Sequence, residues 1–541
     1  MDISAIGRLA GRNTIGDALR RAAMNFRDAA ALHFAGRDWS FQALDHAADR
    51  VARRLLTLGL VKGDRVLAYG RNSDAYLLLW LGCARAGLVH VPVNYALTAA
   101  ELEYVGTQSG AAALIHDPAL AANAQIAARA CKIARLGTFH ADAELDILRI
   151  AQNQSGDGGL VGEDVSDSDV AQILYTSGTT GMPKGATHTH QALISQYASC
   201  IIAFEYKRTD RTLAALPLYH TAQMHAFTMP QILMGVEAWL IESPVPADSL
   251  ELIERHGITS FFAPPTVWIS FLRHPNFTTR DLRTLRNIYY GASIMPLPII
   301  QELRQRLPGA RPYQAYGQTE IAPLATVLTP EEHDARPTSV GRPVLNVMTR
   351  VVDTEMRDCP PGVHGEIVHR SPQLLREYWN KPAETAEAFA GSWFHSGDIG
   401  YMDEEGYLYI VDRVKDLINT GGVLVASREV EDALFTHPAI AEVAVIALPD
   451  PRWLEAVTAV VVLRPGQSVD EAALIAHARQ TLAPFKLPKR VIFVETLPKN
   501  TSGKLLKREL RVLYAGQESA VMGGDGKTVA LRPLRPAKSP S

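Results

Sequence analysis

Residues 175–185 read YTSGTTGMPKG and directly follow the mostly apolar run 170–175. Glycines let a backbone turn with positive φ and approach a ligand closely, while hydroxyl and amide groups donate to phosphate oxygens. A lysine adds a positive charge that attracts phosphate. This composition predicts a polyphosphate-binding loop whose ligand-binding residues are Thr176, Ser177, Gly178, Thr179, Thr180, Gly181 and Lys184.

The loop differs from the Walker A pattern, which requires G-x-x-x-x-G-K-[ST]. Here Pro183, which has no N–H, precedes the lysine, and Gly185 follows it. A flexible surface turn is the alternative, but such turns rarely combine this many donors with a lysine beyond a strand. After the loop, Thr189 is the expected N-cap of a helix over residues 191–204.

Length and composition limit the class of protein. A chain of 541 residues with 47% hydrophobic content predicts several domains or subdomains with sizeable cores. A net charge of -3 gives no sign of a nucleic-acid partner. The cysteines lack metal-ligand spacing, which favours a reducing compartment without structural zinc.

The sequence contains neither a signal peptide nor a membrane span by its hydropathy pattern. Polar residues interrupt every apolar stretch near the N-terminus, and no window approaches the length of uninterrupted apolar sequence that a transmembrane helix needs. We therefore expect a cytoplasmic protein with no membrane span.

Strand and helix patterns alternate through the first four hundred residues. Apolar, β-branched runs at 64–68, 89–93 and 112–116 enclose helical patterns at 73–86 and 99–109. This alternation predicts α/β architecture with mostly parallel sheets.

The pattern changes later in the chain. Short hairpin-like segments at 346–371 predict a β-rich subdomain, and a compact α+β pattern begins near Asp412. We expect an N-terminal domain at 1–411, a C-terminal domain at 412–515, and a disordered tail at 516–541, because the tail has no periodicity.

The loop at 175–185 closely resembles the phosphate-loop signature of the adenylate-forming (AMP-binding) superfamily. This superfamily contains acyl-CoA synthetases, carrier-loading adenylation domains and beetle luciferases. Further matches occur in the family order between about residues 40 and 513, including YGQTE at 316–320 and Gly503-Lys504. The resemblance implies a large N-terminal domain of two α/β sheet subdomains and a β-rich subdomain, followed by a small mobile C-terminal domain.

The resemblance also implies a nucleotide site. Tyr316 would stack on adenine, Gln314 would read its polar edge, Thr319 would contact the α-phosphate and Glu320 would hold Mg²⁺ together with Thr176. A hard cation prefers carboxylate and phosphate oxygens, so one glutamate plus substrate phosphates is a reasonable site. Without the resemblance, these residues would be ordinary loop chemistry. The small residues under the adenine and acyl groups would be Gly291, Ala292, Ser293, Ala315 and Gly317.

Two charged residues match the ribose-binding part of the family pattern. Asp398 in WFHSGDIG would bind the ribose hydroxyls beside Arg413, and Ser396 replaces the more usual threonine. Lys415 falls at the family's hinge, about which the C-terminal domain swings between half-reactions. The alternative for Asp398 is a surface Asp-Gly turn, and on the residues alone Arg413-Lys415-Asp416 is only a charged turn.

The resemblance places the catalytic lysine at Lys504. Attack of a carboxylate on the α-phosphate brings two anions together, and a cation at the developing charge offsets their repulsion. The other candidate catalytic residues are Glu320, Thr176 and His220. A lone histidine beside apolar residues, like His220, is more often structural.

The acceptor site departs from the pattern of many CoA ligases. Gly421 and Gly422 would still admit a pantetheine arm, but Val423-Leu424 replaces Glu-Asn, and Leu454 replaces a usual glycine. These departures bear on the second half-reaction, the transfer to CoA, and not on adenylation.

Together these patterns predict an ATP- and Mg²⁺-dependent acyl-CoA synthetase that forms an acyl-adenylate and transfers the acyl group to CoA. The apolar neighbours Met224, Phe227, Ile294 and Leu324 favour a medium- or long-chain fatty acid, with an aryl or arylpropenoic acid second. An acyl-AMP ligase that loads a carrier protein is the rival enzyme, and a homodimer is left open. A luciferase-like oxygenase is disfavoured by Asn419, and a non-enzymatic nucleotide-binding protein by the intact charged residues.

Overall fold

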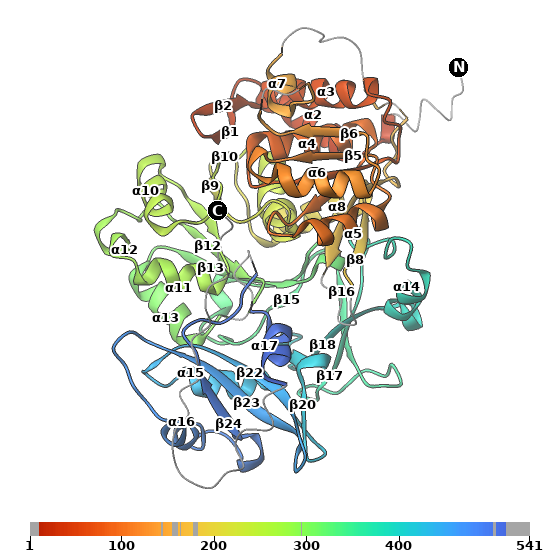
Figure 1. Ribbon diagram of the computed structural model, residues 1–541. Coiled ribbons are helices and arrows are strands. Elements are labelled where there is room, and N and C mark those ends of the chain that lie inside the picture. The colour runs from red at the N-terminus through yellow and green to blue at the C-terminus, as the bar shows by residue number, and fades with distance from the viewer. Residues whose placement is uncertain are drawn as a thin grey trace. The chain divides into compact units, whose positions relative to one another are not determined.

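The computed structural model describes residues 10–141, 144–153, 161–162, 164–176, 182–293, 295–500 and 505–515 (Figure 1). The tail expected at 516–541 lies outside these residues. Contacts within the chain define two compact units. The first comprises Met1–Ser396 and Gly400–Ile410, and the second comprises Gly397–Ile399 and Val411–Ser541.

The first sheet of unit 1 carries the predicted phosphate loop. Among the described residues it has six strands in the order β6-β5-β3-β4-β7-β8. All neighbouring strands run parallel except β7 and β8, which form an antiparallel pair around the loop. The strands are β3 (Arg65–Tyr69), β4 (Val89–Val93), β5 (Ala113–His116), β6 (Arg135–Thr138), β7 (Val170–Thr176) and β8 (Lys184–Thr189).

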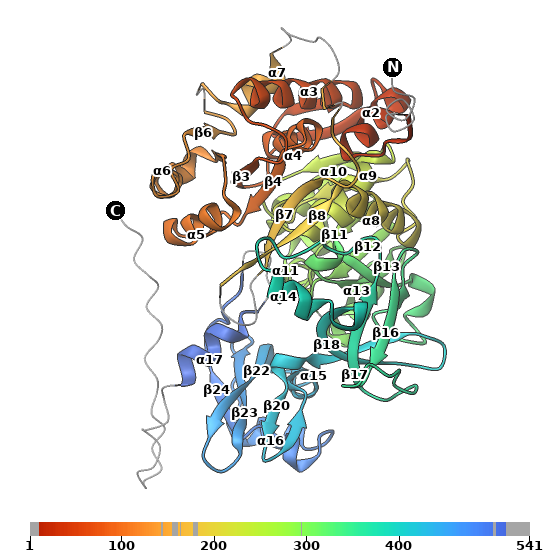
Figure 2. The same ribbon diagram turned by 90° about the vertical axis from the view of Figure 1, so that its right-hand side faces the viewer.

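Helices cover both faces of this sheet (Figure 2). Because side chains alternate along a strand, Val66 and Ala68 of β3 pack in one core cluster with α3 and α4. Leu67 and Tyr69 face the other way and pack with α5 and α6. The helices are α3 (Phe41–Thr57), α4 (Asp74–Ala86), α5 (Ala99–Ser109) and α6 (Ala121–Ala130). The predicted strand and helix alternation is therefore confirmed.

The second sheet of unit 1 has nine strands in the described part of the chain, ordered β15-β14-β13-β12-β11-β9-β10-β1-β2. Its centre is parallel, and β2, β14 and β15 pair antiparallel at the two edges. Its strands are β1 (Ala30–Phe34), β2 (Arg37–Ser40), β9 (Arg211–Ala214), β10 (Glu237–Leu240), β11 (Ser260–Phe262), β12 (Asn287–Gly291), β13 (Arg311–Gly317), β14 (Leu324–Leu328) and β15 (Arg342–Pro343).

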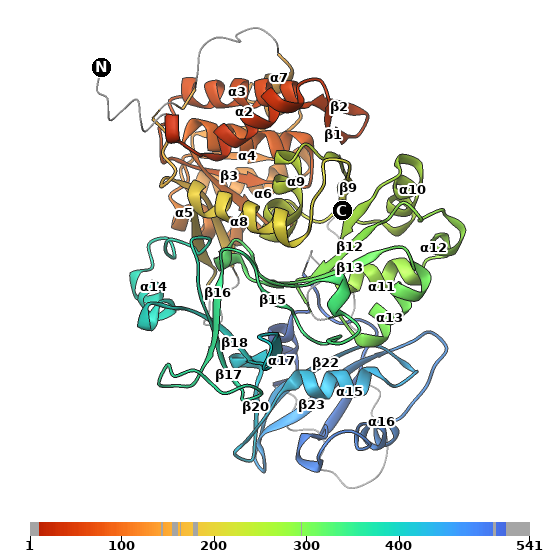
Figure 3. The ribbon, with the colours of Figure 1, turned by 180° about the vertical axis from the view of Figure 1, so that it is seen from behind.

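Aromatic side chains fill both faces of the second sheet. Phe261 of β11 packs 5.3 Å from the Phe271 ring on α11, and α11 and α13 lie beside β12 and β13 (Figure 3). On the opposite face, the Phe227 ring stacks 4.0 Å from that of Phe262. Thr189 caps α8 as predicted, accepting from the Ala192 N–H at 3.1 Å, although the helix begins at His190. The helices of this part are α8 (His190–Ala203), the π-helical η2 (Ala222–Thr228), α9 (Met229–Leu233), α10 (Pro246–His256), α11 (Pro265–Arg273), α12 (Asn276–Thr279) and α13 (Leu297–Arg306).

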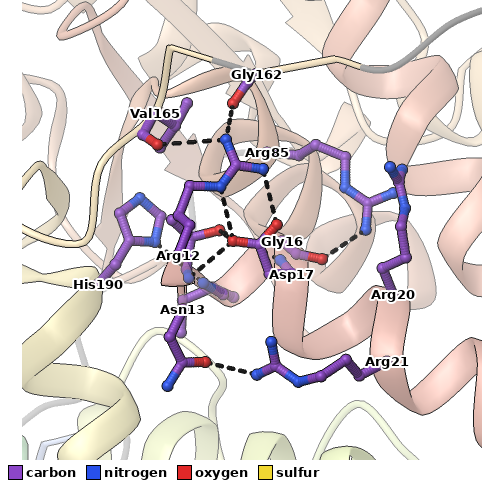
Figure 4. A network of polar contacts seen from close by, with 12 residues as sticks. Arg12, Asn13, Gly16, Asp17, Arg20, Arg21, Arg85, Gly162, Val165 and His190 are labelled. Carbon is purple, nitrogen blue, oxygen red and sulfur yellow. Dashed lines mark hydrogen bonds and ion pairs between the residues drawn. The ribbon is translucent and has the colours of Figure 1, made fainter. Parts of the chain in front are cut away.

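A polar network fixes the connector that precedes β7 (Figure 4). Arg12 pairs with Asp17 of α2 (Ile15–Phe26) at 2.7 Å and donates to the Gly162 carbonyl at 2.7 Å. Arg85 of α4, whose side chain is only 3% exposed, donates to the Gly16 carbonyl at 2.9 Å. The network thus joins the start of α2 to both α4 and the chain that enters the phosphate-loop strand.

A chain of buried hydrogen bonds runs through unit 1. Tyr197 Oη donates to His225 Nδ1 at 2.8 Å, and His225 Nε2 donates to Gln172 Oε1 at 2.7 Å. Gln172 Nε2 then donates to His90 Nδ1 at 3.0 Å. Burial lowers the pKa of His90 to about 3 and that of His188 to about 4. These imidazoles are therefore neutral at neutral pH, as the hydrogen-bond pattern requires.

The remaining strands of unit 1 and the strands of unit 2 form two further sheets. In the part of the chain that the structure describes, the order β16-β17-β18-β19 gives a four-stranded sheet, and β21-β20-β23-β22 with β24 beside β23 gives a five-stranded one. The predicted β-rich and C-terminal α+β segments are thus present. The strands are β16 (Met348–Val352), β17 (Gly365–Arg370), β18 (Phe394–Met402), β19 (Leu408–Arg413), β20 (Ile418–Thr420), β21 (Val423–Val425), β22 (Ile440–Asp450), β23 (Leu454–Leu463) and β24 (Arg490–Phe493), and the helices are α7 (Ile147–Gln152), α14 (Pro382–Ala388), α15 (Ser427–Phe435), α16 (Glu471–Ala478) and α17 (Lys507–Ala515).

We predict that unit 1 loses stability as the pH falls from about 6.5 to about 4. Burial lowers the pKa of His90, His188 and His225 in the folded state, so the unfolded chain binds more protons in this range. Each such histidine adds a slope of about 1.4 kcal/mol per pH unit. Denaturant unfolding at a series of pH values measures the slope of the free energy of unfolding against pH. His188→Gln should reduce the slope, while substitution of the exposed His140 by Gln should not; equal slopes in all three proteins would contradict the prediction.

Candidate active site

The two ends of the phosphate loop lie side by side in the structure. Thr176 at the end of β7 and Lys184 at the start of β8 are register partners. The predicted phosphate ligands between them, Ser177, Gly178, Thr179, Thr180 and Gly181, lie outside the described residues, as do Gly503 and the predicted catalytic Lys504.

Glu320 brings the phosphate loop and the YGQTE motif together. It lies in the short turn η3 (Thr319–Ile321) and is only 8% exposed. Thr176 Oγ1 donates to Glu320 Oε1 at 3.3 Å, and Tyr378 Oη donates to the same oxygen at 3.0 Å. The Lys184 ammonium lies 4.7 Å from the centroid of the Tyr378 ring. Three residues predicted from two separate motifs thus converge, and Tyr378 is a further member that the sequence did not reveal.

Tyr378 belongs to a segment that runs along the free edge of β8. The Trp379 N–H donates to the Gly185 carbonyl at 2.7 Å, and the Thr187 N–H donates to the Glu377 carbonyl at 3.0 Å. At its other end, the Leu375 N–H donates to the Glu320 carbonyl at 2.7 Å. Residues 375–379, which we call the strap, therefore connect the loop's return strand to η3. No periodicity or spacing marks this segment, apart from the Tyr-Trp pair it contains.

The donor set around Glu320 fits a hard divalent cation. It offers a carboxylate and the Thr176 hydroxyl, and both are oxygen donors of the kind that Mg²⁺ prefers. Within the described ranges, no group of three or more His, Cys, Asp or Glu side chains could hold a metal ion.

The predicted adenine-side residues lie at the carboxyl ends of β12 and β13, where open α/β sheets bind ligands. Gly291 pairs with Ala315, and a Cβ on Gly291 would lie 2.4 Å from the Ala315 carbonyl oxygen. Glycine is therefore required there, and the following Ala292 has a φ of 62°. Gln314 accepts from Tyr290 Oη at 3.3 Å, which leaves its amide group as a donor.

Other predicted residues extend this site. The Tyr316 ring lies 6.3 Å from that of His369 in β17, and Thr319 contacts Thr221 with 3.4 Å between their hydroxyl oxygens. The latter contact joins YGQTE to the segment that contains His220, whose ring packs 4.6 Å from that of Tyr219.

The apolar residues expected near the acyl site are buried. Met224, Phe227 and Leu324 expose 2% or less of their surface, and Phe227 is part of the aromatic packing against β11 and β12. Ile294 lies outside the described residues. The described positions thus provide apolar surroundings for the expected acyl site.

Unit 2 contains the predicted ribose-site pair. Asp398 Oδ1 lies 3.2 Å from Arg413 Nε, and the aspartate side chain is 5% exposed. Ser396, which replaces the usual threonine, donates to the Ile367 carbonyl at 2.5 Å. The neighbouring Asp412, which the sequence did not single out, accepts from the Ser427 N–H at 2.6 Å and so holds the start of α15.

The predicted acceptor loop joins β20 to β21. Gly421 and Gly422 have φ values of 65° and 88°, which favour glycine. Leu454, where the family pattern has glycine, also has a positive φ, of 67°. Leu424 and Leu454 are 61% and 64% exposed, so the departures from the pattern place apolar surface beside this loop. The hinge candidate Lys415 lies in the turn η6 (Val414–Asp416).

A partly buried ion pair secures the helix that follows the predicted catalytic lysine. Lys507 Nζ lies 2.7 Å from Glu431 Oε1 of α15 and donates to Ser427 Oγ at 2.7 Å. Arg511, one turn further along α17, pairs with Asp416 at 2.5 Å. The segment that leads from residue 504 is therefore fixed to the body of unit 2.

This arrangement defines a nucleotide-dependent enzyme with a phosphate loop, a carboxylate beside it and a separate C-terminal unit. The family profile described as AMP-binding enzyme matches residues 19–379, and that of the AMP-binding enzyme C-terminal domain matches residues 429–504. The chain belongs to the AMP-binding enzyme family, as the resemblance predicted, and is an adenylate-forming acid–thiol ligase.

Known proteins resemble the chain over nearly its full length. A feruloyl-CoA synthase of Amycolatopsis sp is 36% identical over 493 residues, covering 91% of this chain and 97% of that protein. A long-chain-fatty-acid–CoA ligase of Bacillus subtilis is 32% identical over 529 residues, covering 92% and 94%. The crystal structure of ATP-bound MatB from Rhodopseudomonas palustris superposes with a TM-score of 0.86 at 32% identity, covering 93% and 99%. No helix within the described residues is long and apolar enough to cross a membrane.

We predict that Gly291→Ala raises the KM for ATP by about tenfold, because the added methyl group forces β12 and β13 apart at a cost of about 1–3 kcal/mol. Steady-state kinetics of pyrophosphate release measures the effect. Gly309→Ala is the matched control, since a Cβ there has no atom within 4 Å. An unchanged KM for ATP in Gly291→Ala would show that nucleotide does not bind against this position.

Proposed function

We propose that the protein is an ATP- and Mg²⁺-dependent acyl-CoA synthetase that activates a medium- or long-chain carboxylic acid as acyl-AMP and transfers the acyl group to CoA. The observation that carries this proposal is the convergence of Thr176, Lys184 and Glu320 at the phosphate loop. A cation, a hydroxyl and a carboxylate meet there without a Walker A sequence, in a chain of the adenylate-forming family.

The first half-reaction uses residues of the phosphate loop and the nucleotide site. Lys184 and the loop hold the β- and γ-phosphates as the leaving group, while Tyr316 and Gln314 bind adenine. Glu320 and Thr176 would hold Mg²⁺, which when bound supplies positive charge against the phosphate oxygens. The α-phosphate is then open to the substrate carboxylate, and Lys504 offsets the repulsion between the two anions.

The second half-reaction uses the C-terminal part of the chain. We place an N-terminal domain at 1–411 and a mobile C-terminal domain at 412–515, with Lys415 as the hinge. Asp398 and Arg413 hold the ribose, and Gly421 and Gly422 let the backbone accommodate the pantetheine arm of CoA. His220 borders the acyl group. We assign the enzyme to the cytoplasm.

An arylpropenoic acid is the second candidate substrate. A relative that is 36% identical is named feruloyl-CoA synthase, and Phe227, Phe262 and Tyr289 form an aromatic wall on one face of the second sheet. Flat aromatic acids pack well against such surfaces. Carrier-protein loading is the alternative second step, supported by the exposed apolar side chains Val423 and Leu424 beside the acceptor loop.

We predict that Lys504→Ala lowers the rate of acyl-adenylate formation by about 100- to 1000-fold, because it removes a cation from the developing charge. Transfer to CoA from supplied acyl-AMP should remain largely intact. Lys499→Ala is the matched control, since Lys499 pairs with Glu442 at 2.6 Å in the same unit. Equal loss of both half-reactions in Lys504→Ala would contradict the assignment.

We predict that pyrophosphate release is fastest with fatty acids of medium or long chain and that AMP release then depends on CoA. A screen over fatty acids of graded length and hydroxycinnamic acids, with CoA, with a phosphopantetheinylated carrier protein and with neither, measures both steps. Preference for hydroxycinnamic acids would establish the second candidate substrate. Turnover with the carrier but not with CoA would overturn the proposed acceptor.

A further inference from the structure

We propose that Tyr378 is a positioning residue that orients Glu320 for the metal–nucleotide complex while its ring supports the Lys184 ammonium. This inference rests on the proposed Mg²⁺ site, and it assigns a role to a residue outside the phosphate-loop and YGQTE motifs. Its side chain contacts the two charged groups that would bind the metal–nucleotide complex, the Glu320 carboxylate and the Lys184 ammonium.

The hydroxyl of Tyr378 orients the carboxylate. Tyr378 Oη donates to Glu320 Oε1 at 3.0 Å, and Thr176 Oγ1 donates to the same oxygen at 3.3 Å. Because both donors bind Oε1, neither of them occupies Oε2, and the inference assigns this second oxygen to the cation. Burial, together with the nearby Glu320 carboxylate, raises the pKa of Tyr378, so its hydroxyl stays protonated and remains a donor.

The ring of Tyr378 acts on the cation of the loop. Lys184 Nζ lies 4.7 Å from the ring centroid, within the range at which an ammonium is attracted to an aromatic face. A lysine side chain has many rotamers, and this contact restricts them before phosphate binds. One side chain thus limits the freedom of both the carboxylate and the ammonium.

The backbone of the strap makes this placement rigid. Ala186 of β8 and Tyr378 form an antiparallel bridge, flanked by hydrogen bonds from Thr187 N to Glu377 O and from Trp379 N to Gly185 O. Tyr378 is itself 6% exposed. Its ring position is therefore set by main-chain pairing with the strand that begins at Lys184.

The chain offers a close structural match as a control. Tyr407 is also buried, donates to the Glu332 carboxylate at 2.5 Å, and has the Arg336 guanidinium 3.9 Å from its ring centroid. It therefore combines the same two interactions in the same unit without contacting a predicted site residue. The variant Tyr407→Phe therefore measures how much the loss of a buried tyrosine–carboxylate hydrogen bond destabilises the fold, without any change in the site.

The experiment compares Tyr378→Phe, Tyr378→Leu and Tyr407→Phe with the wild-type protein. ATP–pyrophosphate exchange is measured against Mg²⁺ concentration, and calorimetry measures ATP binding with and without Mg²⁺. Tyr378→Phe keeps the ring, so we expect the Mg²⁺ concentration for half-maximal rate to rise about tenfold, the effect of losing a hydrogen bond to a charged group. Metal-free ATP binding and the KM for the acid should not change.

Tyr378→Leu also removes the ring, so ATP binding should weaken both with and without Mg²⁺, while Tyr407→Phe should match the wild type in every site measurement. An unchanged Mg²⁺ dependence in Tyr378→Phe would overturn the inference. So would a loss of melting temperature and maximal rate without a shift in Mg²⁺ dependence, since that is a purely structural effect. Failure of the proposed function looks different, because the wild-type protein itself would then show no Mg²⁺-dependent ATP binding or exchange.

Discussion

The site depends on the pairing of β8 along both of its edges. One edge pairs with β7, which places Thr176 opposite Lys184, and the other pairs with the strap, which brings Tyr378 under the Lys184 ammonium. The same strap also binds η3, because its Leu375 N–H donates to the Glu320 carbonyl. Main-chain hydrogen bonds therefore fix the Thr176 hydroxyl and the Lys184 ammonium relative to the Glu320 carboxylate, which is far from both in sequence. Such preorganisation reduces the conformational entropy that these side chains lose when phosphate binds.

The core beneath this site is polar but uncharged. β8 carries His188, and the neighbouring β7 and β4 carry Gln172 and His90, which link through His225 to Tyr197. Burial keeps the pKa values of these histidines low, so their ring nitrogens alternate as donors and acceptors. Hydrogen bonds between neutral buried groups favour one arrangement of the elements that carry them, whereas burying a charged imidazole there would cost free energy.

The sequence predicts those features that local chemistry determines. The strand at 89–93 and the helix at 73–86 follow from periodicity, and Thr189 is recognisable as a cap. Glu320 and Thr176 belong to short contiguous motifs, which can be recognised directly in the sequence. Tyr378 and Asp412 could not be predicted in the same way, because their roles depend on contacts with distant parts of the chain. Tyr378 pairs with β8, and Asp412 accepts a hydrogen bond from the start of α15. The sequence around each of them shows no periodicity that would mark it as a functional residue.

Leu454 occupies a position where the family pattern has glycine, and it has a backbone conformation that glycine favours. The φ of Leu454, 67°, lies in the left-handed region. Leu454 pairs with Thr420 at the end of β20, next to the loop that contains Gly421 and Gly422. The Gly421 N–H donates to the Trp453 carbonyl at 2.6 Å, so pairing on both sides holds the leucine in this conformation at a cost of about 1–2 kcal/mol. The leucine therefore has a backbone conformation that glycine would also adopt, and it adds an exposed apolar side chain. Under the proposed function, it changes the surface offered to the acceptor and leaves the adenylation residues of unit 1 unaltered.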